Sequence, residues 1–320
     1  MSLAWLFRFA DRTHPLLLPG LLMLGSFTLY ITVASLTEGG QVRDAIGERS
    51  FAGTLALFSL LPGYLLAMMS LQRRRTIQAL AAFEPSRDTA QIQSVRNRLD
   101  RLHPMALLGV AAGMIFGVQQ NLNFVDEMYQ QISLNAMDIA FIGGNCFVWG
   151  FIAMVLCWRV PVSIGVSRLG EAMVLDIYRL DKLKPLARLA TTDILVVAGG
   201  FVLMPLQSLD AEFRMGNYTA GLIVGVPSAA ILFLLPLWGL HKNIRRSKVQ
   251  RLQSLRARLD EVDRQDVPLL ETLTAHIDRV RMLPDWPIDM QTVTRVFAYV
   301  IIPPLAWVGA ALVENFVNSF

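Results

Sequence analysis

The stretch from residue 219 to residue 262, TAGLIVGVPSAAILFLLPLWGLHKNIRRSKVQRLQSLRARLDEV, decides the fold. Its first 22 residues carry no charge, and about 20 apolar residues are the length of helix that crosses roughly 30 Å of hydrocarbon. The remainder is rich in arginine and places apolar residues at spacings of three, four and three, a pattern that packs against another helix. A membrane helix followed by a cytoplasmic helix is therefore the unit from which we interpret the chain.

The rest of the chain follows the same plan. Of its 320 residues, 54% are hydrophobic and 17% are charged, whereas a soluble domain is about 45–50% apolar and about 25% charged. Runs of about 20 apolar residues predict seven transmembrane helices, because a backbone in lipid must satisfy its hydrogen bonds within its own segment. These runs lie near 16–36, 51–71, 105–125, 138–158, 189–209, 219–240 and 294–315.

The basic residues predict the orientation. The N-terminal stretch and the connections 72–104, 159–188 and 241–295 hold 26 of the 29 Lys and Arg residues, and the alternate connections hold only Arg43, Arg49 and Arg214. The positive-inside rule then places the N-terminus in the cytoplasm and the C-terminus outside, with the plasma (inner) membrane as the expected location. The net charge of +4 reflects this topology and membrane-surface contacts, and we do not expect nucleic-acid binding.

This topology makes the chain an all-α, polytopic membrane protein with cytoplasmic helical hairpins. Its predicted parts are an N-terminal segment with two membrane helices (1–71), a cytoplasmic hairpin (72–104), membrane helices three and four (105–158), a cytoplasmic amphipathic helix (159–188), membrane helices five and six (189–240), a second cytoplasmic hairpin (241–293), and membrane helix seven with an outer C-terminus (294–320).

The cytoplasmic connections are predicted to be packed helices. In the second hairpin, Asp266-Val267-Pro268 separates two runs of three-four-three spacing. Their polar faces mix acids with arginines, which favours packed hairpins over helices lying flat on the membrane. Seams this short gain from packing within or between subunits, so these residues form a candidate assembly seam: Leu252, Leu255, Leu259, Val262, Leu270, Leu273, Ile277 and Val280. In the middle connection, 159–188, one helix is expected to end at Lys184-Pro185.

Polar residues at membrane depth mark either helix packing or a functional path. Gln119, Gln120 and Asn121 lie near the outer third of the third membrane helix, and Asn145 lies at a similar depth in the fourth. These amides are expected either to hydrogen-bond between the helices or to line a polar cavity. Asp193 is expected to cap the start of the fifth helix.

The seventh membrane helix contains Pro303-Pro304 near its middle. Each proline lacks a backbone N–H, so the carbonyls of Tyr299 and Val300, four residues earlier, lose their helical hydrogen-bond donors. Broken helices with such carbonyls occur in transport proteins. Glu314 lies near the outer end of the same helix, where it is either simply hydrated or an ion-attracting group at a pore mouth.

The sequence contains none of the catalytic or cofactor-binding signatures that we can recognise, so neither an enzyme nor a cofactor is expected. Two interpretations remain. The first is a homo-oligomeric channel or transporter whose cytoplasmic helices assemble or gate it; some oligomeric channels share this topology and line the pore with their last helix. The second is a membrane-anchored scaffold or signalling component that binds a cytoplasmic protein partner. Prolines and buried amides favour the first, and the apparent lack of a titratable group near the midplane favours the second.

Overall fold

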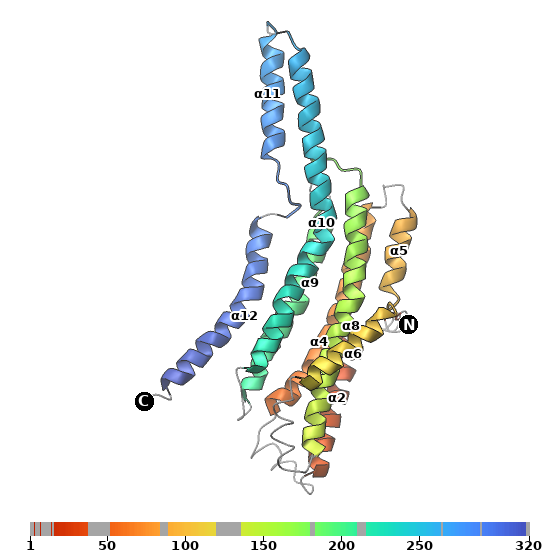
Figure 1. Cartoon of the computed structure of the whole chain (residues 1–320), viewed down its shortest axis with the longest axis vertical. Helices are drawn as coiled ribbons and strands as arrows, with labels where there is room; N and C mark the ends of the chain where they lie inside the picture. Colours follow the sequence, from red (N-terminus) through yellow and green to blue (C-terminus); the bar gives the residue numbers. More distant parts are fainter. Residues whose placement is uncertain are drawn as a thin grey trace.

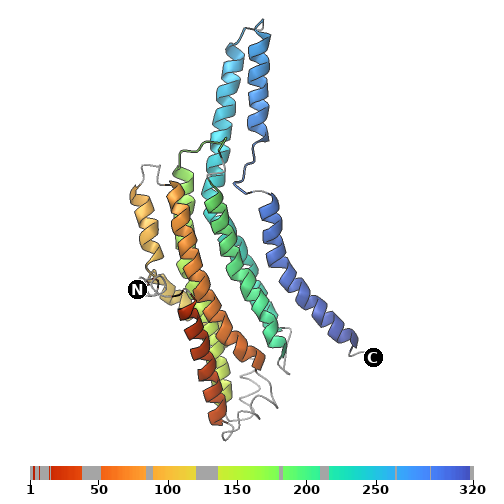
Figure 2. The same cartoon turned by 180° about the vertical axis from the view of Figure 1, so that it is seen from behind.

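The computed structural model of this chain describes residues 3, 7, 14, 16–37, 52–83, 89–119, 136–179, 183–209, 216–263, 265–288 and 290–317. Over these residues it contains nine α-helices and no β-strand, so the predicted all-α class is confirmed. The helices run mostly along one long axis, and the hairpin of α10 (Gly216–Glu261) and α11 (Val267–Met282) extends beyond the others (Figures 1 and 2).

Four helices of the described part are long and apolar enough to cross a membrane, where seven were predicted. They are Gly53–Leu80, Phe141–Ala172, Lys184–Gln207 and Tyr218–Glu261. These stretches belong to α4 (Ala52–Leu80), α8 (Ala136–Ala172), α9 (Lys184–Leu203) with the short 3₁₀-helix Met204–Leu209, and α10. The chain is therefore consistent with a multi-pass membrane protein, and the number of crossings is corrected to four by this criterion.

The remaining three predicted segments also form helices, but these are not among the four spans found over the described residues. The apolar part of α2 (Leu17–Thr37) is Leu17–Val33. Helix α6 (Met105–Gln119) has 15 residues, which rise only about 22 Å. The seventh segment lies in α12 (Met290–Val317), whose side chains are described only in part.

Helix α8 corrects the prediction of a separate helix at 159–188. It continues without a break from Ala136 to Ala172, through Pro161, and the chain is non-helical from Met173 to Arg179. Lys184 and Pro185, expected to end a helix, instead begin α9. Proline suits the first turn of a helix because its missing N–H has no intrahelical partner there.

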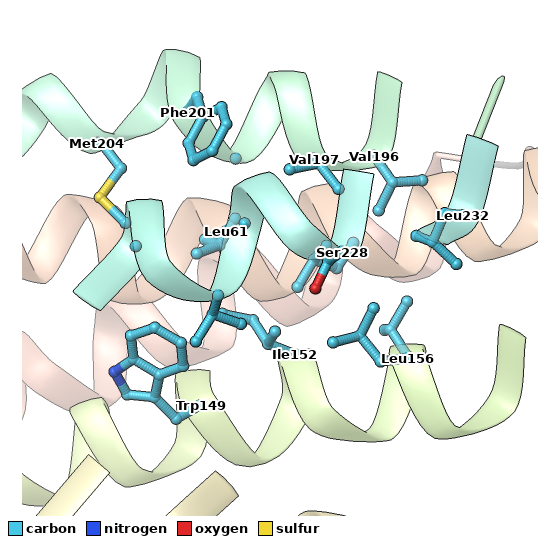
Figure 3. Close-up of a pocket in the computed structure, with 16 residues that line it drawn as sticks. Leu61, Trp149, Ile152, Leu156, Val196, Val197, Phe201, Met204, Ser228 and Leu232 are labelled. Carbon is cyan, nitrogen blue, oxygen red and sulfur yellow. The ribbon is translucent and has the colours of Figure 1, made fainter. Parts of the chain in front are cut away.

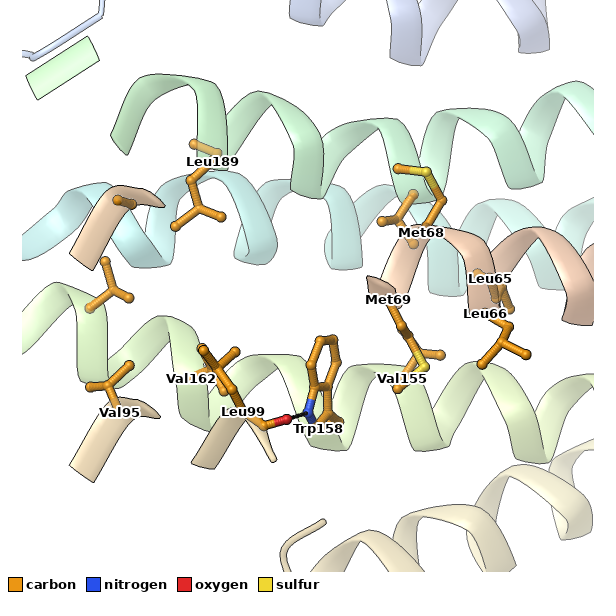
Figure 4. Packing of buried hydrophobic residues seen from close by; sticks show 14 of the residues in the cluster. Leu65, Leu66, Met68, Met69, Val95, Leu99, Val155, Trp158, Val162 and Leu189 are labelled. Carbon is orange, nitrogen blue, oxygen red and sulfur yellow. Dashed lines mark hydrogen bonds between the residues drawn. The ribbon is translucent and has the colours of Figure 1, made fainter. Parts of the chain in front are cut away.

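The main hydrophobic core joins α4, α5 (Thr89–Leu99), α8, α9 and α10. Helix α5 buries Ile92, Val95 and Leu99 in it, and the indole Nε1 of Trp158 donates to the Leu99 carbonyl oxygen at 3.2 Å (Figure 4). The predicted amphipathic seam of the first hairpin is therefore packed onto the membrane bundle.

A second, smaller core holds the α10–α11 hairpin together. It contains Leu255 from α10 with Leu273, Ile277 and Val280 from α11, and Ile177 from the α8–α9 connection. The carboxylate of Asp266 caps α11 by accepting from the Leu269 backbone amide at 3.3 Å. The two predicted seams thus pack against each other within one chain.

Helices α8 and α10 approach closely at the end of the bundle that faces this hairpin. A Cβ at Gly239 would clash with the Ser167 carbonyl oxygen, so only glycine fits there. The Asn243 amide on α10 donates to the carbonyls of Gly170 and Met173, at 2.9 and 2.7 Å. These bonds satisfy carbonyls that the end of α8 leaves without intrahelical partners.

Candidate functional site

A fully buried ion pair joins three helices of the bundle. Arg159 on α8 and Asp193 on α9 both have 0% exposed side chains and make a bidentate contact, Nε to Oδ1 at 2.8 Å and Nη2 to Oδ2 at 2.7 Å. Helix α4 completes the network: Gln72 donates to Asp193 Oδ1 at 2.8 Å, and Thr76 Oγ1 accepts from Arg159 Nη1 at 2.9 Å. The pair therefore ties α4, α8 and α9 together.

This network has both a cost and a structural use. Taking two charges out of water costs several kcal/mol per ion, and only close geometry with further hydrogen bonds offsets that cost. Here each ion has such an extra bond, from Gln72 or to Thr76. A bidentate guanidinium–carboxylate pair also fixes distance and direction, so the network sets the register of the three helices.

The sequence interpretation missed this site. It assigned Arg159 to a cytoplasmic connection and Asp193 to a helix cap, whereas α9 begins nine residues earlier, at Lys184, and Asp193 lies in its interior. The signal that could have found the site is that Gln72, Arg159 and Asp193 each lie at the same predicted end of three apolar runs. The sequence interpretation placed both charged residues at this end of the apolar runs but did not predict that they form a buried pair.

The predicted amide cluster is described only in part. Gln119 is exposed at the end of α6, and Gln120 and Asn121 lie outside the described residues. Asn145 on α8 donates to the Gly117 carbonyl oxygen of α6 at 3.3 Å. This amide therefore forms a hydrogen bond between the two helices. A Cβ at Gly113 or Gly117 would collide with the α8 backbone, which explains why α6 has glycine at these two positions.

Helix α12 carries the predicted path residues. It remains helical from Met290 to Val317 through both Pro303 and Pro304, so the double proline does not interrupt it, and its ribbon curves away from the bundle (Figures 1 and 2). Tyr299 is 42% exposed. The side chains of Pro304 and Glu314 are outside the described part, so the predicted role of Glu314 stays a prediction.

The segment between α11 and α12 is fixed to α10. Lys248 Nζ donates to the Leu283 carbonyl oxygen at 2.7 Å and to Asp285 Oδ1 at 2.8 Å. The His241 ring stacks on Trp286 with centroids 4.2 Å apart. These contacts hold the start of α12 at one position relative to the bundle.

A basic cavity of about 840 Å³ lies next to this segment, between the last part of α4, the start of α9 and the start of α12. Its lining includes four cationic side chains from these three helices and no acidic residue among those described: Arg75, Lys184, Arg188 and Arg295. Thr191, Thr192, Thr292 and Tyr299 add hydroxyl groups. This cavity is polar and strongly basic.

A second, smaller cavity of about 80 Å³ lies among α4, α8, α9 and α10. Figure 3 shows Trp149, Ile152 and Leu156 on one side and Val197, Phe201 and Met204 on the other, with the Ser228 hydroxyl between them. An apolar lining of this kind suits an apolar molecule or no occupant, because a charged group there would lose its hydration without compensation. It is not lined for ions.

Comparison with known protein families, with curated proteins and with solved structures finds no match to this chain. The described residues bring no group of three or more His, Cys, Asp or Glu side chains together at a potential metal site. We therefore infer function from the geometry of the chain itself.

Proposed function

We propose that this chain is one subunit of a homo-oligomeric membrane channel or transporter, and that α12 borders the path. The observation that carries the proposal is the packing of α12. Over the described residues, α9 is the only element with which α12 makes extensive contact. Its Phe297, Ile302 and Leu305 are 60%, 60% and 61% exposed. A second subunit would cover this apolar face.

The double proline distinguishes this face from an ordinary lipid-facing one. Pro303 and Pro304 lack the backbone N–H groups that would otherwise donate hydrogen bonds to the carbonyls of Tyr299 and Val300. A carbonyl without a donor is costly in lipid, but it is tolerated where it faces protein or a water-filled cavity. The prolines therefore favour a subunit boundary or a wet path along α12.

The direction of the helices supports the predicted orientation as part of the same proposal. Helices α2, α4, α6, α8, α9, α10 and α12 run in alternating directions along the long axis (Figures 1 and 2). In this arrangement the basic connections and the α10–α11 hairpin lie in the cytoplasm, and the C-terminus lies outside.

The scaffold interpretation remains the second candidate because of the α10–α11 hairpin. Helix α10 has 46 residues, which rise about 69 Å, more than twice the thickness of a hydrocarbon core. The excess length serves a cytoplasmic purpose, either gating or binding a partner protein. A pull-down with residues 242–283 tests only this candidate.

Cysteine cross-linking tests the proposed function. In protein with Cys146 and Cys157 replaced by alanine, Phe297→Cys should form disulfide-linked dimers in the membrane and should alter ion flux from proteoliposomes until reduced. Leu24→Cys is the matched control, since Leu24 is 68% exposed on α2, across the bundle from α12 (Figures 1 and 2). Equal cross-linking at both sites, or none at Phe297 with no flux, contradicts the proposal.

A further inference from the structure

The basic cavity concentrates positive charge in a confined space. Arg75 comes from α4, Lys184 and Arg188 from α9, and Arg295 from α12, so residues far apart in the sequence meet around one volume. At about 840 Å³ the cavity falls within the range of small-molecule sites, which is about 300–1,000 Å³. Gathering like charges is unfavourable unless an anion joins them.

Two acidic residues that neighbour this lining in sequence, Asp285 and Asp193, pair with other groups. The Asp285 carboxylate lies between the lining residues Pro284 and Trp286 in sequence, but it binds Lys248 Nζ at 2.8 Å. Asp193 follows the lining residue Thr192, but it is paired with Arg159 and Gln72 in the core. The charge that the described lining residues contribute to the cavity is therefore positive only.

The first turn of α9 adds backbone donors to the same cavity. Lys184 and Ala187 line it, and the N-cap residue Leu183 makes no side-chain capping hydrogen bond. The N-terminal N–H groups of a helix and its dipole favour an anion. The hydroxyls of Thr191 and Thr192 donate back to the Ala187 and Arg188 carbonyls, at 3.0 and 2.9 Å, so these two hydroxyl protons are already used within α9.

We propose that this cavity binds a ligand carrying two or more phosphate charges. Arginine matches phosphate because its planar guanidinium donates two parallel hydrogen bonds, and three of the four cations are arginines. The lining also includes Pro284, Trp286, Pro287 and Ile288, which suits a ligand with an apolar part. The phosphate comes either from an anionic phospholipid headgroup or from a soluble polyphosphate. The site does not depend on the protein being a channel.

Binding assays with two probes test the proposal and separate the sources. Pyrophosphate is titrated into purified protein in neutral detergent. Nanodiscs with or without about 30% cardiolipin, a lipid whose headgroup carries two phosphates, report stabilisation by lipid. Arg188→Gln with Arg295→Gln should weaken binding by about tenfold or more, since each lost charge-assisted bond is worth about that factor. Arg256→Gln with Arg258→Gln on α10 removes the same charge from exposed positions and should leave binding unchanged.

The outcomes are distinct. Pyrophosphate binding that the cavity variant loses indicates a soluble phosphate ligand. Stabilisation by anionic nanodiscs alone, lost in the same variant, indicates a headgroup. Equal behaviour of the cavity and control variants with both probes overturns the proposal. Arg188→Lys with Arg295→Lys keeps the charge and loses the bidentate geometry, so intermediate binding by this variant separates a built phosphate site from general attraction, and unchanged binding contradicts it.

Discussion

At the scale of single residues, the Arg159–Asp193 pair is the contact with the largest consequence. Each partner is fully buried, so removing one leaves an uncompensated charge in the core. Arg159→Met should lower the free energy of unfolding by about 3–5 kcal/mol, measured by chemical denaturation in mixed micelles. The double variant Arg159→Met with Asp193→Leu should recover much of this loss, because neither charge then remains.

The control for this prediction is an exposed pair on α11. Arg281 and Asp278 are 56% and 54% exposed with 3.7 Å between Nη1 and Oδ1, and Arg281→Gln should change stability by less than about 1 kcal/mol. A double core variant whose loss equals the sum of the two single losses would mean that the pair is not coupled, and that it does not set the register of the three helices.

Gly239 provides a second residue-scale prediction. A methyl group at this position meets the Ser167 carbonyl oxygen, so Gly239→Ala should separate α8 from α10 and lower stability by about 1–3 kcal/mol. Gly143→Ala on α8 is the matched control, because nothing lies within 4 Å of its added Cβ. That substitution should be neutral or stabilising by up to about 1 kcal/mol, and thermal unfolding in detergent compares the two.

At the scale of elements, the spacing of apolar residues predicted which helix faces pack together. The positions of charged residues did not predict the buried ion pair or the basic cavity. Three-four-three spacing predicted the α10–α11 contact, since helix geometry is local and brings residues three and four apart onto one face. The Arg159–Asp193 pair joins residues 34 apart on two helices, and no local pattern encodes which helices meet. Likewise, Arg75, Arg188 and Arg295 share a cavity only because of the tertiary fold, and the sequence interpretation treated them as topology signals.

Helix boundaries show the same limit. Nothing between 158 and 172 breaks α8, so it runs past its predicted end, and Asn243 on α10 bonds to the carbonyls near its true end. That contact comes from a helix 70 residues later in the chain, so the sequence around residue 172 does not reveal it.

The hairpin core makes an element-scale prediction. Leu255 is 4% exposed and packs against α11, so Leu255→Glu should release α11 while the separate bundle core stays intact. Hydrogen exchange should rise by about tenfold or more over residues 267–282, as expected when a buried leucine becomes a charge. Val249→Glu, at a position 47% exposed, should not change exchange there. If residues 267–282 stay protected from exchange in Leu255→Glu, the packing of α11 against Leu255 is contradicted. The role of the seam in subunit assembly stays a prediction, and the oligomer mass of the same variant tests it.

At the scale of the whole molecule, a rigid bundle supports two less tightly held parts. Helices α4, α8, α9 and α10 share the main core, whereas α11 has its own small cluster and α12 contacts mainly α9. The linker 283–288 joins both outer parts and is fixed through Lys248 and His241. The α10–α11 hairpin and α12 are therefore linked through one short segment, and in the proposed function this segment would couple the hairpin to α12.

Ion flux from liposomes holding the purified protein tests the proposed channel or transporter function most directly. We expect flux above that of empty liposomes, and a change of about threefold or more when Pro303→Ala with Pro304→Ala restores the two amide donors of α12, since about 0.7 kcal/mol in the barrier gives that factor. Circular dichroism and the oligomer mass verify that both proteins are folded and assembled equally. Absence of flux from folded, inserted protein, with and without the Leu255→Glu change that releases the hairpin, would contradict the channel or transporter function.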